Sequence, residues 1–265
     1  MNLNFSRRIV ASLFGTILLF GSGSLFAESV SFPLPTLYTE ISGGLGYQKS
    51  DFTADVNISP TSSNYHRLIN NSDWKTLVSG GISSGLLFPL GRANPDYGIQ
   101  NGSSNGASIG LGVSAKVISF KPQKGIIIPV YNINPSGDTF DYEFKMISFP
   151  IFGEARIMLG LHGISAVGIL GYGASFNKLY DFSAKPTDPS GSLVSFDPYA
   201  DKLQLNKAYE FGVSLLKKIS DHYSAGIDYR YISLGKPRLG KRNQSVEPEI
   251  GSLKVHLLNL VILIK

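Results

Sequence analysis

Two stretches near the C-terminus alternate between apolar and polar residues with a period of two. At residues 209–215 and 223–231, every odd position is apolar or aromatic, and nearly every even position is small, polar or charged. Only a β-strand sends successive side chains to opposite faces. The polar face carries Glu210, Asp228 and Arg230. A soluble β-sandwich buries its apolar face, whereas a transmembrane barrel turns that face to lipid and keeps charges inside.

The composition favours the barrel. Hydrophobic residues make up 43% of the 265 residues and charged residues 16%, against roughly 25% charged residues in soluble domains. The chain has no cysteine, which excludes disulfides, thiol catalysis and cysteine-ligated metals. Without the two arginines near the N-terminus, 22 basic residues face 19 acidic ones, a net charge of +3. That excess is too small to predict nucleic-acid binding.

The first 27 residues are organised like a secretory signal peptide. Two arginines precede an apolar stretch at residues 9–20, and small residues lead to Ala27. This order is typical of cleaved export signals. An uncleaved anchor is the alternative, but the Gly-Ser interruption at residues 21–24 leaves less than the roughly 20 apolar residues of a spanning helix. We expect cleavage after Ala27 and a barrel domain over residues 28–265.

Eight segments of the mature chain carry strand patterning. They are residues 37–48, 74–90, 107–120, 140–159, 164–176, 209–215, 223–231 and 253–264. In lipid every backbone donor and acceptor must be paired within the protein, so a sheet can cross only as a closed barrel. An even number of strands of about 9–11 residues predicts an all-β, eight-stranded antiparallel transmembrane barrel. A soluble sandwich is the alternative.

Aromatic residues gather toward the strand ends, where rings with a polar tip favour the membrane–water boundary. They are Tyr47, Trp74, Phe88, Tyr142, Tyr172, Phe176, Tyr209, Tyr229 and Tyr231.

Two segments break the alternation. In residues 140–159 the apolar phase switches at Pro150, where we expect a one-residue β-bulge that turns both halves outward. In residues 253–264 we expect Lys254 inside. That phase then places Asn259 outside and four apolar side chains inside. A locally apolar barrel floor or a second bulge would explain this, and the pattern does not choose between them.

Long and short connections alternate along most of the chain. Residues 160–163 and 218–222 are short enough for tight turns. Four longer segments are expected to be extracellular loops, at about residues 50–73, 121–139, 178–204 and 235–251. Outer-membrane barrels show this asymmetry, with long loops outside and tight turns in the periplasm. The connection at residues 91–106 is too long for the pattern.

On these residues the chain resembles the OmpA/OmpX-type superfamily of small, porin-like outer-membrane β-barrel proteins. The resemblance rests on the opening strand at residues 37–47, the break at residues 149–151 and the strand pair at residues 209–231. It implies location in the bacterial outer membrane, insertion by the barrel-insertion machinery, and contact with outer-membrane lipid and lipopolysaccharide. Members usually end in an aromatic residue that this machinery reads, whereas this sequence ends at Lys265.

The motifs of common catalytic and cofactor sites are weak here. Gly110 and Gly112 fit a loose dinucleotide fingerprint, but they lie inside a strand instead of between a strand and a helix. None of the four histidines has ligand spacing with another histidine or a carboxylate. His222 and Ser224 resemble the His-x-Ser of outer-membrane lipid A deacylases, but Asp228 is expected to point inward, away from them. We therefore predict no catalytic residue, no metal and no cofactor.

Charged side chains are expected on the inner face of the barrel. They are Glu40, Lys75, Lys116, Glu154, Arg156, Glu210, Asp228, Arg230 and Lys254. Eight strands leave an interior that side chains about fill, and buried charges need partners. We predict a structural polar core with Glu210, Asp228 and Arg230 at its centre. A narrow path for ions or solutes is the alternative.

The last long connection is basic, with Lys236, Arg238, Lys241 and Arg242. These residues are candidates for contact with polyanions such as lipopolysaccharide phosphates or host glycans, and a solvated loop is the alternative. The sequence as a whole predicts an integral outer-membrane protein with a structural or surface-interaction role, adhesin- or antigen-like, on a scaffold that displays loops. A narrow porin-like channel is the alternative, and a lipid-modifying enzyme is a weaker one. The surface ligand is not indicated.

Overall fold

The computed structural model describes ten stretches of the chain. They are residues 34–49, 53–57, 65–70, 74–90, 106–131, 134–135, 137–188, 194–195, 199–241 and 247–265. The expected signal peptide, the connection at residues 91–105 and Arg242 lie outside the described residues.

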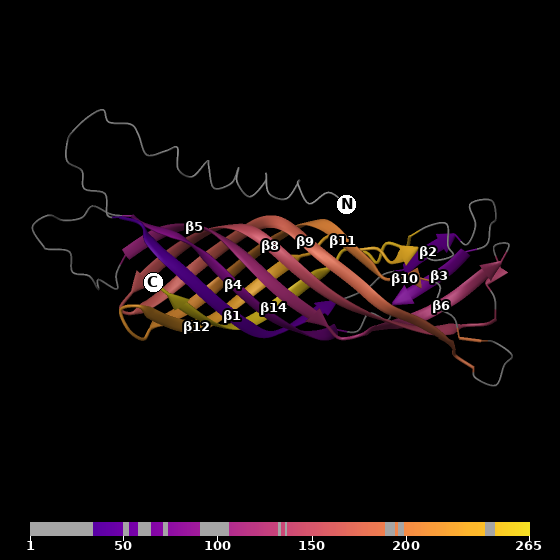
Figure 1. The fold of residues 1–265 in the computed structure, drawn as a ribbon. Helices are drawn as coiled ribbons and strands as arrows, with labels where there is room; N and C mark the ends of the chain where they lie inside the picture. Colours follow the sequence, from indigo (N-terminus) through magenta and orange to yellow (C-terminus); the bar gives the residue numbers. More distant parts are fainter. Residues whose placement is uncertain are drawn as a thin grey trace, which may run out of the picture. The chain divides into compact units, whose positions relative to one another are not determined.

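Eight long antiparallel strands close into a barrel (Figure 1). They are β1 (Thr36–Lys49), β4 (Trp74–Leu90), β5 (Gly106–Phe120), β8 (Phe140–Leu161), β9 (Ile164–Pro186), β11 (Lys202–Lys218), β12 (Tyr223–Ser233) and β14 (Lys254–Ile264). Each strand pairs with the next in this order, and β14 pairs back with β1, where Leu258 is the partner of Leu45. The ring leaves no open edge in lipid, so the predicted eight-stranded antiparallel barrel is confirmed.

The strand register shows how strongly the ring is sheared. One row of cross-strand partners begins on β1 at Tyr38 and returns to β1 at Gln48, ten residues further along. The row is Tyr38, Gly85, Gly112, Glu154, Gly171, Glu210, Ile232, Val255 and Gln48. Strand number and shear together fix the tilt of the strands and the width of the interior. In this protein the interior is narrow enough that a Cβ on Gly112 would lie 2.5 Å from the Tyr38 hydroxyl.

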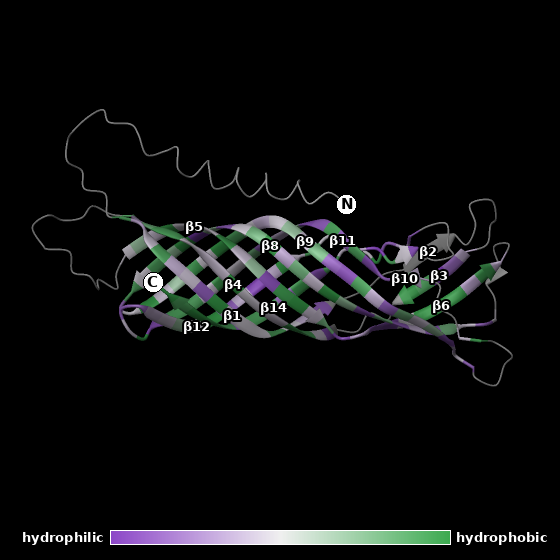
Figure 2. Ribbon diagram, viewed as in Figure 1, coloured by the Kyte–Doolittle hydropathy of each residue, from purple (hydrophilic) through white to green (hydrophobic). Residues whose placement is uncertain are grey.

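Side chains alternate between the two faces of the wall, as Figure 2 shows by the change of hydropathy from residue to residue. The outward positions are apolar and exposed, for example Leu45 at 66%, Leu170 at 66% and Leu260 at 72%. The inward positions include buried carboxylates and guanidinium groups. This is the reverse of a soluble core, and it identifies a barrel whose outer face contacts lipid.

Both irregular segments differ from the sequence prediction. β8 keeps one phase throughout, with Pro150 on the inner face and no bulge there. The irregularity lies nearer the start of β8, where the strand shifts register against β9 between Glu143 and Lys145, opposite Asp181, whose φ is +53°. β14 also keeps one phase, but the inverse of the expected one, with Asn259 inside and Lys254 outside. Along both strands the inward-facing residues change from polar to apolar. In the sequence this change looks like a switch of phase, although each strand keeps the same face inward.

The two ends of the barrel differ. At one end lie the start of β1, the end of β14 and two tight turns. The turn between β8 and β9 is His162-Gly163, and both of its φ angles are positive, as this type of two-residue hairpin turn requires. At the other end, β8 and β9 extend to 22 and 23 residues, roughly twice the 9–11 residues that cross a membrane. Short turns are periplasmic in such barrels, so the extended end is extracellular.

Segments expected to be loops carry strands at the extracellular end. β2 (Thr53–Asn57), β3 (Tyr65–Asn70) and β6 (Gln123–Tyr131) add to β8 in the order β2-β3-β6-β8, and β7 (Asn134–Pro135) pairs with β6. β10 (Tyr199–Ala200) pairs with β13 (Gly240–Lys241). We call β2, β3, β6 and the outer parts of β8 and β9 the extracellular sheet; Figure 1 shows β2, β3 and β6 beyond the end of the barrel.

The lack of room in the interior can be tested at Gly112. A Cβ there would also lie 2.5 Å from the backbone oxygen of Ser84, which cannot move away without disturbing the β4–β5 ladder. We expect Gly112→Ala to lower the free energy of unfolding by about 1–3 kcal/mol. Urea unfolding in lipid vesicles measures this. Gly168→Ala on β9 is the matched control, because nothing lies within 4 Å of its Cβ position. Equal effects of the two changes would contradict the tight interior.

Candidate functional site: the filled lumen and the extracellular sheet

The lumen is filled in three layers along the barrel axis. The periplasmic layer is apolar and consists of Tyr38, Leu87, Met158, Val167, Ile169, Leu216, Val261 and Leu263. The central layer holds the buried charges. The extracellular layer is again apolar and continues into the extracellular sheet; among its members are Leu77, Ile118, Phe144, Met146, Leu179, Ile232, Val255 and Leu257.

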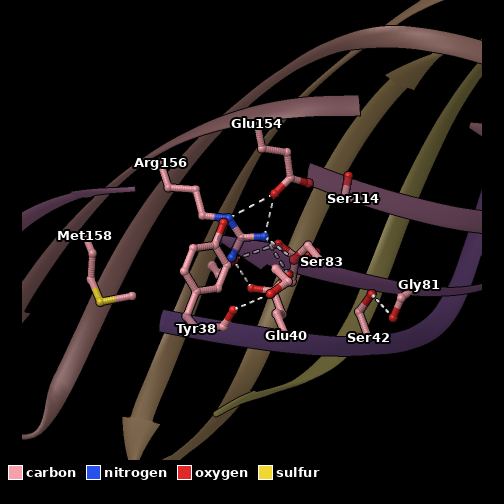
Figure 3. Close-up of polar contacts among 12 residues, drawn as sticks. Tyr38, Glu40, Ser42, Gly81, Ser83, Ser114, Glu154, Arg156 and Met158 are labelled. Atoms are coloured by element: carbon pink, nitrogen blue, oxygen red, sulfur yellow. Dashed lines mark hydrogen bonds and ion pairs between the residues drawn. The ribbon is translucent and has the colours of Figure 1, made fainter. Parts of the chain in front are cut away.

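Arg156 on β8 occupies the periplasmic side of the central layer (Figure 3). Its guanidinium donates to both oxygens of Glu40, at 2.5 and 3.2 Å, and to Glu154 Oε2 at 2.6 and 3.0 Å. It also donates to Ser83 Oγ at 2.6 Å and lies 4.8 Å above the ring centroid of Tyr38. Arg156 is 1% exposed. The planar fork of an arginine suits such paired carboxylates, because its donors are fixed in direction.

Arg230 on β12 repeats this arrangement with other strands. Its Nε lies 2.8 Å from both oxygens of Asp228, and its Nη2 donates to Glu40 at 3.1 Å. Asp228 also accepts from Ser214 at 2.7 Å and from the side-chain amide of Asn259 at 3.1 Å. Glu40 on β1 therefore lies between two arginines, one from β8 and one from β12, which are reached from β1 in opposite directions around the ring.

Lys116 on β5 completes the layer. Its ammonium lies 2.9 Å from Glu210 and 3.4 Å from Glu154, and it donates to Ser114 at 3.2 Å. A guanidinium nitrogen of Arg230 lies 3.6 Å from each of these glutamates. Room for Glu210 comes from Gly171 on β9, where a Cβ would lie 2.7 Å from Glu210 Cγ.

The structure places seven of the nine predicted lumen charges in one network. They are Glu40, Lys116, Glu154, Arg156, Glu210, Asp228 and Arg230. Lys75 faces the lumen nearer the extracellular end, where it is the register partner of Gln48. Lys254 lies exposed on the outer face, so its predicted place in the lumen is wrong. Within the network four acids face three bases.

The sequence analysis missed the polar residues that complete this network. Asn259 is the direct cross-strand partner of Asp228 and accepts a hydrogen bond from Ser79 at 2.9 Å. The signal was present, because a lone asparagine among leucines is unfavourable against lipid. Turning Asn259 inward would have placed Lys254 outward and corrected the phase of the whole strand.

The apolar layer continues inside the extracellular sheet. Phe182 stacks on Tyr142 with ring centroids 5.6 Å apart and meets the edge of Tyr199 at 4.9 Å. Burial raises the pKa of both tyrosines. This packing supports the sheet where it extends beyond the barrel, and it closes the lumen from outside.

The basic residues of the last long connection are partly neutralised. Lys236 and Arg238 both reach Glu249, at 3.1 and 3.2 Å. The hydrogen bond from Lys236 does most to lower the pKa of the Glu249 carboxyl. Lys241 lies exposed on β13. The structure thus brings two of the four predicted residues together around one carboxylate, which reduces the charge they offer to a polyanion.

Comparisons with known proteins find distant similarity to solved structures of outer-membrane proteins. No family model and no curated protein matches the chain. Neisserial surface protein A is 14% identical over 88% of this chain and 99% of its own, with a TM-score of 0.39. OprG from Pseudomonas aeruginosa is 10% identical over 86% and 96%, with a TM-score of 0.41. Ail of Yersinia pestis is 13% identical over 86% and 97%, with a TM-score of 0.29. The assignment of a closed eight-stranded barrel rests on the strand pairing of this chain itself.

The buried network gives a direct mutational test. Arg156→Met removes the cation that Glu40 and Glu154 share, so two buried carboxylates lose their closest partner. We expect a loss of about 3–5 kcal/mol in the free energy of unfolding. The double variant Arg156→Met/Glu40→Gln should recover part of that loss. Urea unfolding in vesicles is the measurement.

Lys145→Met is the control for this test. It breaks the exposed ion pair between Lys145, which lies on β8 like Arg156, and Asp181 on β9. It should leave the unfolding midpoint almost unchanged because exposed pairs contribute little. A loss as small for Arg156 as for Lys145 would mean that the central layer is hydrated.

Proposed function

We propose that this protein is a surface-interaction protein of the outer membrane, in which the barrel is a closed anchor and the extracellular sheet is the binding module. The observation that carries the proposal is the continuous packing from the charged layer through the apolar layer into that sheet. The strands do not stop at the membrane boundary but continue into a sheet with a packed inner face.

The filled lumen argues against the alternative of a narrow channel. A path along the axis would have to cross two apolar layers and a charged layer whose side chains are hydrogen-bonded to one another. Ion pathways need polar linings and sites that an ion can enter and leave. The interior supports the role of a structural core instead.

The outer face of the extracellular sheet is suited to contact with a partner. Lys124 pairs with Glu143 at 3.2 Å, and Lys145 pairs with Asp181 at 3.0 Å, so charges of both signs alternate across β6, β8 and β9. A cleft of about 460 Å³ lies at the same strands, between Lys124 and Lys185. A rigid, concave and mixed-charge surface fits recognition of a polar macromolecule outside the cell.

The closed lumen predicts electrical silence. Purified protein inserted into planar bilayers should give no steady conductance at moderate voltage, because the central layer leaves no free polar path. Matched insertion should be verified by counting protease-protected protein in the same preparation. A reproducible, ohmic conductance step that changes ion selectivity in Arg230→Gln would contradict the proposal and support the channel.

The binding role predicts a gain of adherence. A non-adherent bacterial strain that displays the protein should bind cultured epithelial cells several-fold better than the same strain without it. A variant in which a short Gly-Asn turn replaces residues 123–144 removes β6, β7 and the facing start of β8. It keeps the complete ring, because the turn then joins residues that lie opposite each other, and it should lose that gain.

Surface level and folding of both proteins can be matched by heat-modifiable gel mobility. If the shortened variant adheres as well as the complete protein, the extracellular sheet is not the binding module. If neither adheres, the surface-interaction role itself is wrong.

A further inference from the structure

A row of rings crosses four neighbouring strands on the outer wall of the barrel. Tyr47 on β1, His256 on β14, Tyr231 on β12 and Phe211 on β11 are successive cross-strand partners. Tyr47 stacks on His256 with centroids 4.8 Å apart, and Phe211 stacks on Tyr231 at 4.7 Å. Tyr229 is joined to His256 Nδ1 by a hydrogen bond of 2.7 Å. We call these five residues the ring platform.

The ring platform lies at the extracellular boundary of the apolar band. Below it on the same face are Leu258, Leu260 and Val213, all more than 60% exposed. Above it on the same face are two lysines, Lys254 two residues beyond His256 and Lys207 four residues beyond Phe211. On β14 the surface therefore changes from aliphatic to aromatic to cationic over a few residues, which is the order from acyl chains to headgroups in a membrane. On β11 the exposed Leu205 follows beyond Lys207 on the same face.

The two lysines lie near each other on the outer face of the barrel. Tyr209, two residues from Lys207, is the partner of Ser233, and Ser233 is the partner of Lys254. Lys207 and Lys254 are therefore separated by two strand spacings across β12 and by two residues along the strand direction, or about 12 Å between their Cα atoms. Both are exposed on the outer face, and within the described part of the chain neither forms an ion pair.

We propose that Lys207, Lys254 and the ring platform form a site for the phosphorylated sugar headgroup of a glycolipid in the outer leaflet. The ammonium groups would bind the phosphates, and the exposed ring faces would pack against the sugar. The class of ligand follows from position and charge: a site beside lipid-facing leucines meets lipid first, and two unpaired cations there match an anionic headgroup. The proposal is independent of the extracellular sheet and of its partner.

The test uses the complete protein in nanodiscs of phosphatidylcholine with increasing fractions of lipid A. Lipid A should raise the thermal unfolding midpoint, and native mass spectrometry should show lipid A bound. In Lys207→Gln/Lys254→Gln the apparent affinity should fall by about thirtyfold, or roughly fivefold per lysine. Lys121→Gln/Lys217→Gln is the matched control, because both lysines are exposed but lie away from the ring platform, one just after β5 on the other side of the ring and the other near the periplasmic end.

Three further arms identify the source of any effect. Dephosphorylated lipid A should give little shift, and inorganic phosphate at the same concentration should give none. His256→Ala should weaken binding of lipid A while its circular dichroism stays that of a folded barrel. The proposal is overturned if the lysine double variant binds like the control pair, or if inorganic phosphate alone reproduces the stabilisation.

Discussion

The requirement that every backbone hydrogen bond be satisfied inside the protein governs this molecule. Lipid offers no donor or acceptor, so the sheet has to close on itself. Once eight strands close with a shift of ten residues from Tyr38 to Gln48, the width of the interior is set. Leucines must then face outward, while the few charges of the strands must share a narrow space with one another.

The central layer shows how this space is used. Glu40 links Arg156 to Arg230, and Glu154 contacts both of these arginines as well as Lys116. Such a network is weak evidence of stability in itself, since desolvation offsets much of the attraction between buried ions. Its contacts do depend on strand register. A slip of one residue would turn a strand's charges toward lipid, so the network disfavours other registers.

The extracellular side has the opposite arrangement of apolar and charged side chains. Beyond the apolar band water surrounds the sheet, so its inner face is apolar and its outer face is charged. Phe144 and Phe182 fill the space that the ion network fills lower down. This change of solvent explains why Tyr142, Phe144 and Met146 share a phase with Glu154 and Arg156 on one uninterrupted strand. It also explains how a membrane anchor and a water-exposed surface can be built from the same strands.

The sequence by itself determined the eight strands, the outward apolar faces of six of them and seven of the buried charges, because a period of two is a local property of each strand. It did not determine the phase of β14 or the uninterrupted course of β8, since apolar residues on both faces leave the inward side ambiguous until neighbouring strands are in register. Asn259 joins the network because the strand register places it opposite Asp228. The same phase of β14 turns Lys254 to the outer face. The long connections could not be recognised as one sheet either, because β3 joins it only by pairing with β6, which lies far away in the sequence. Only the closed ring, with its fixed shear, decided which side chains meet, because contacts across a barrel depend on register between strands and not on the pattern within one.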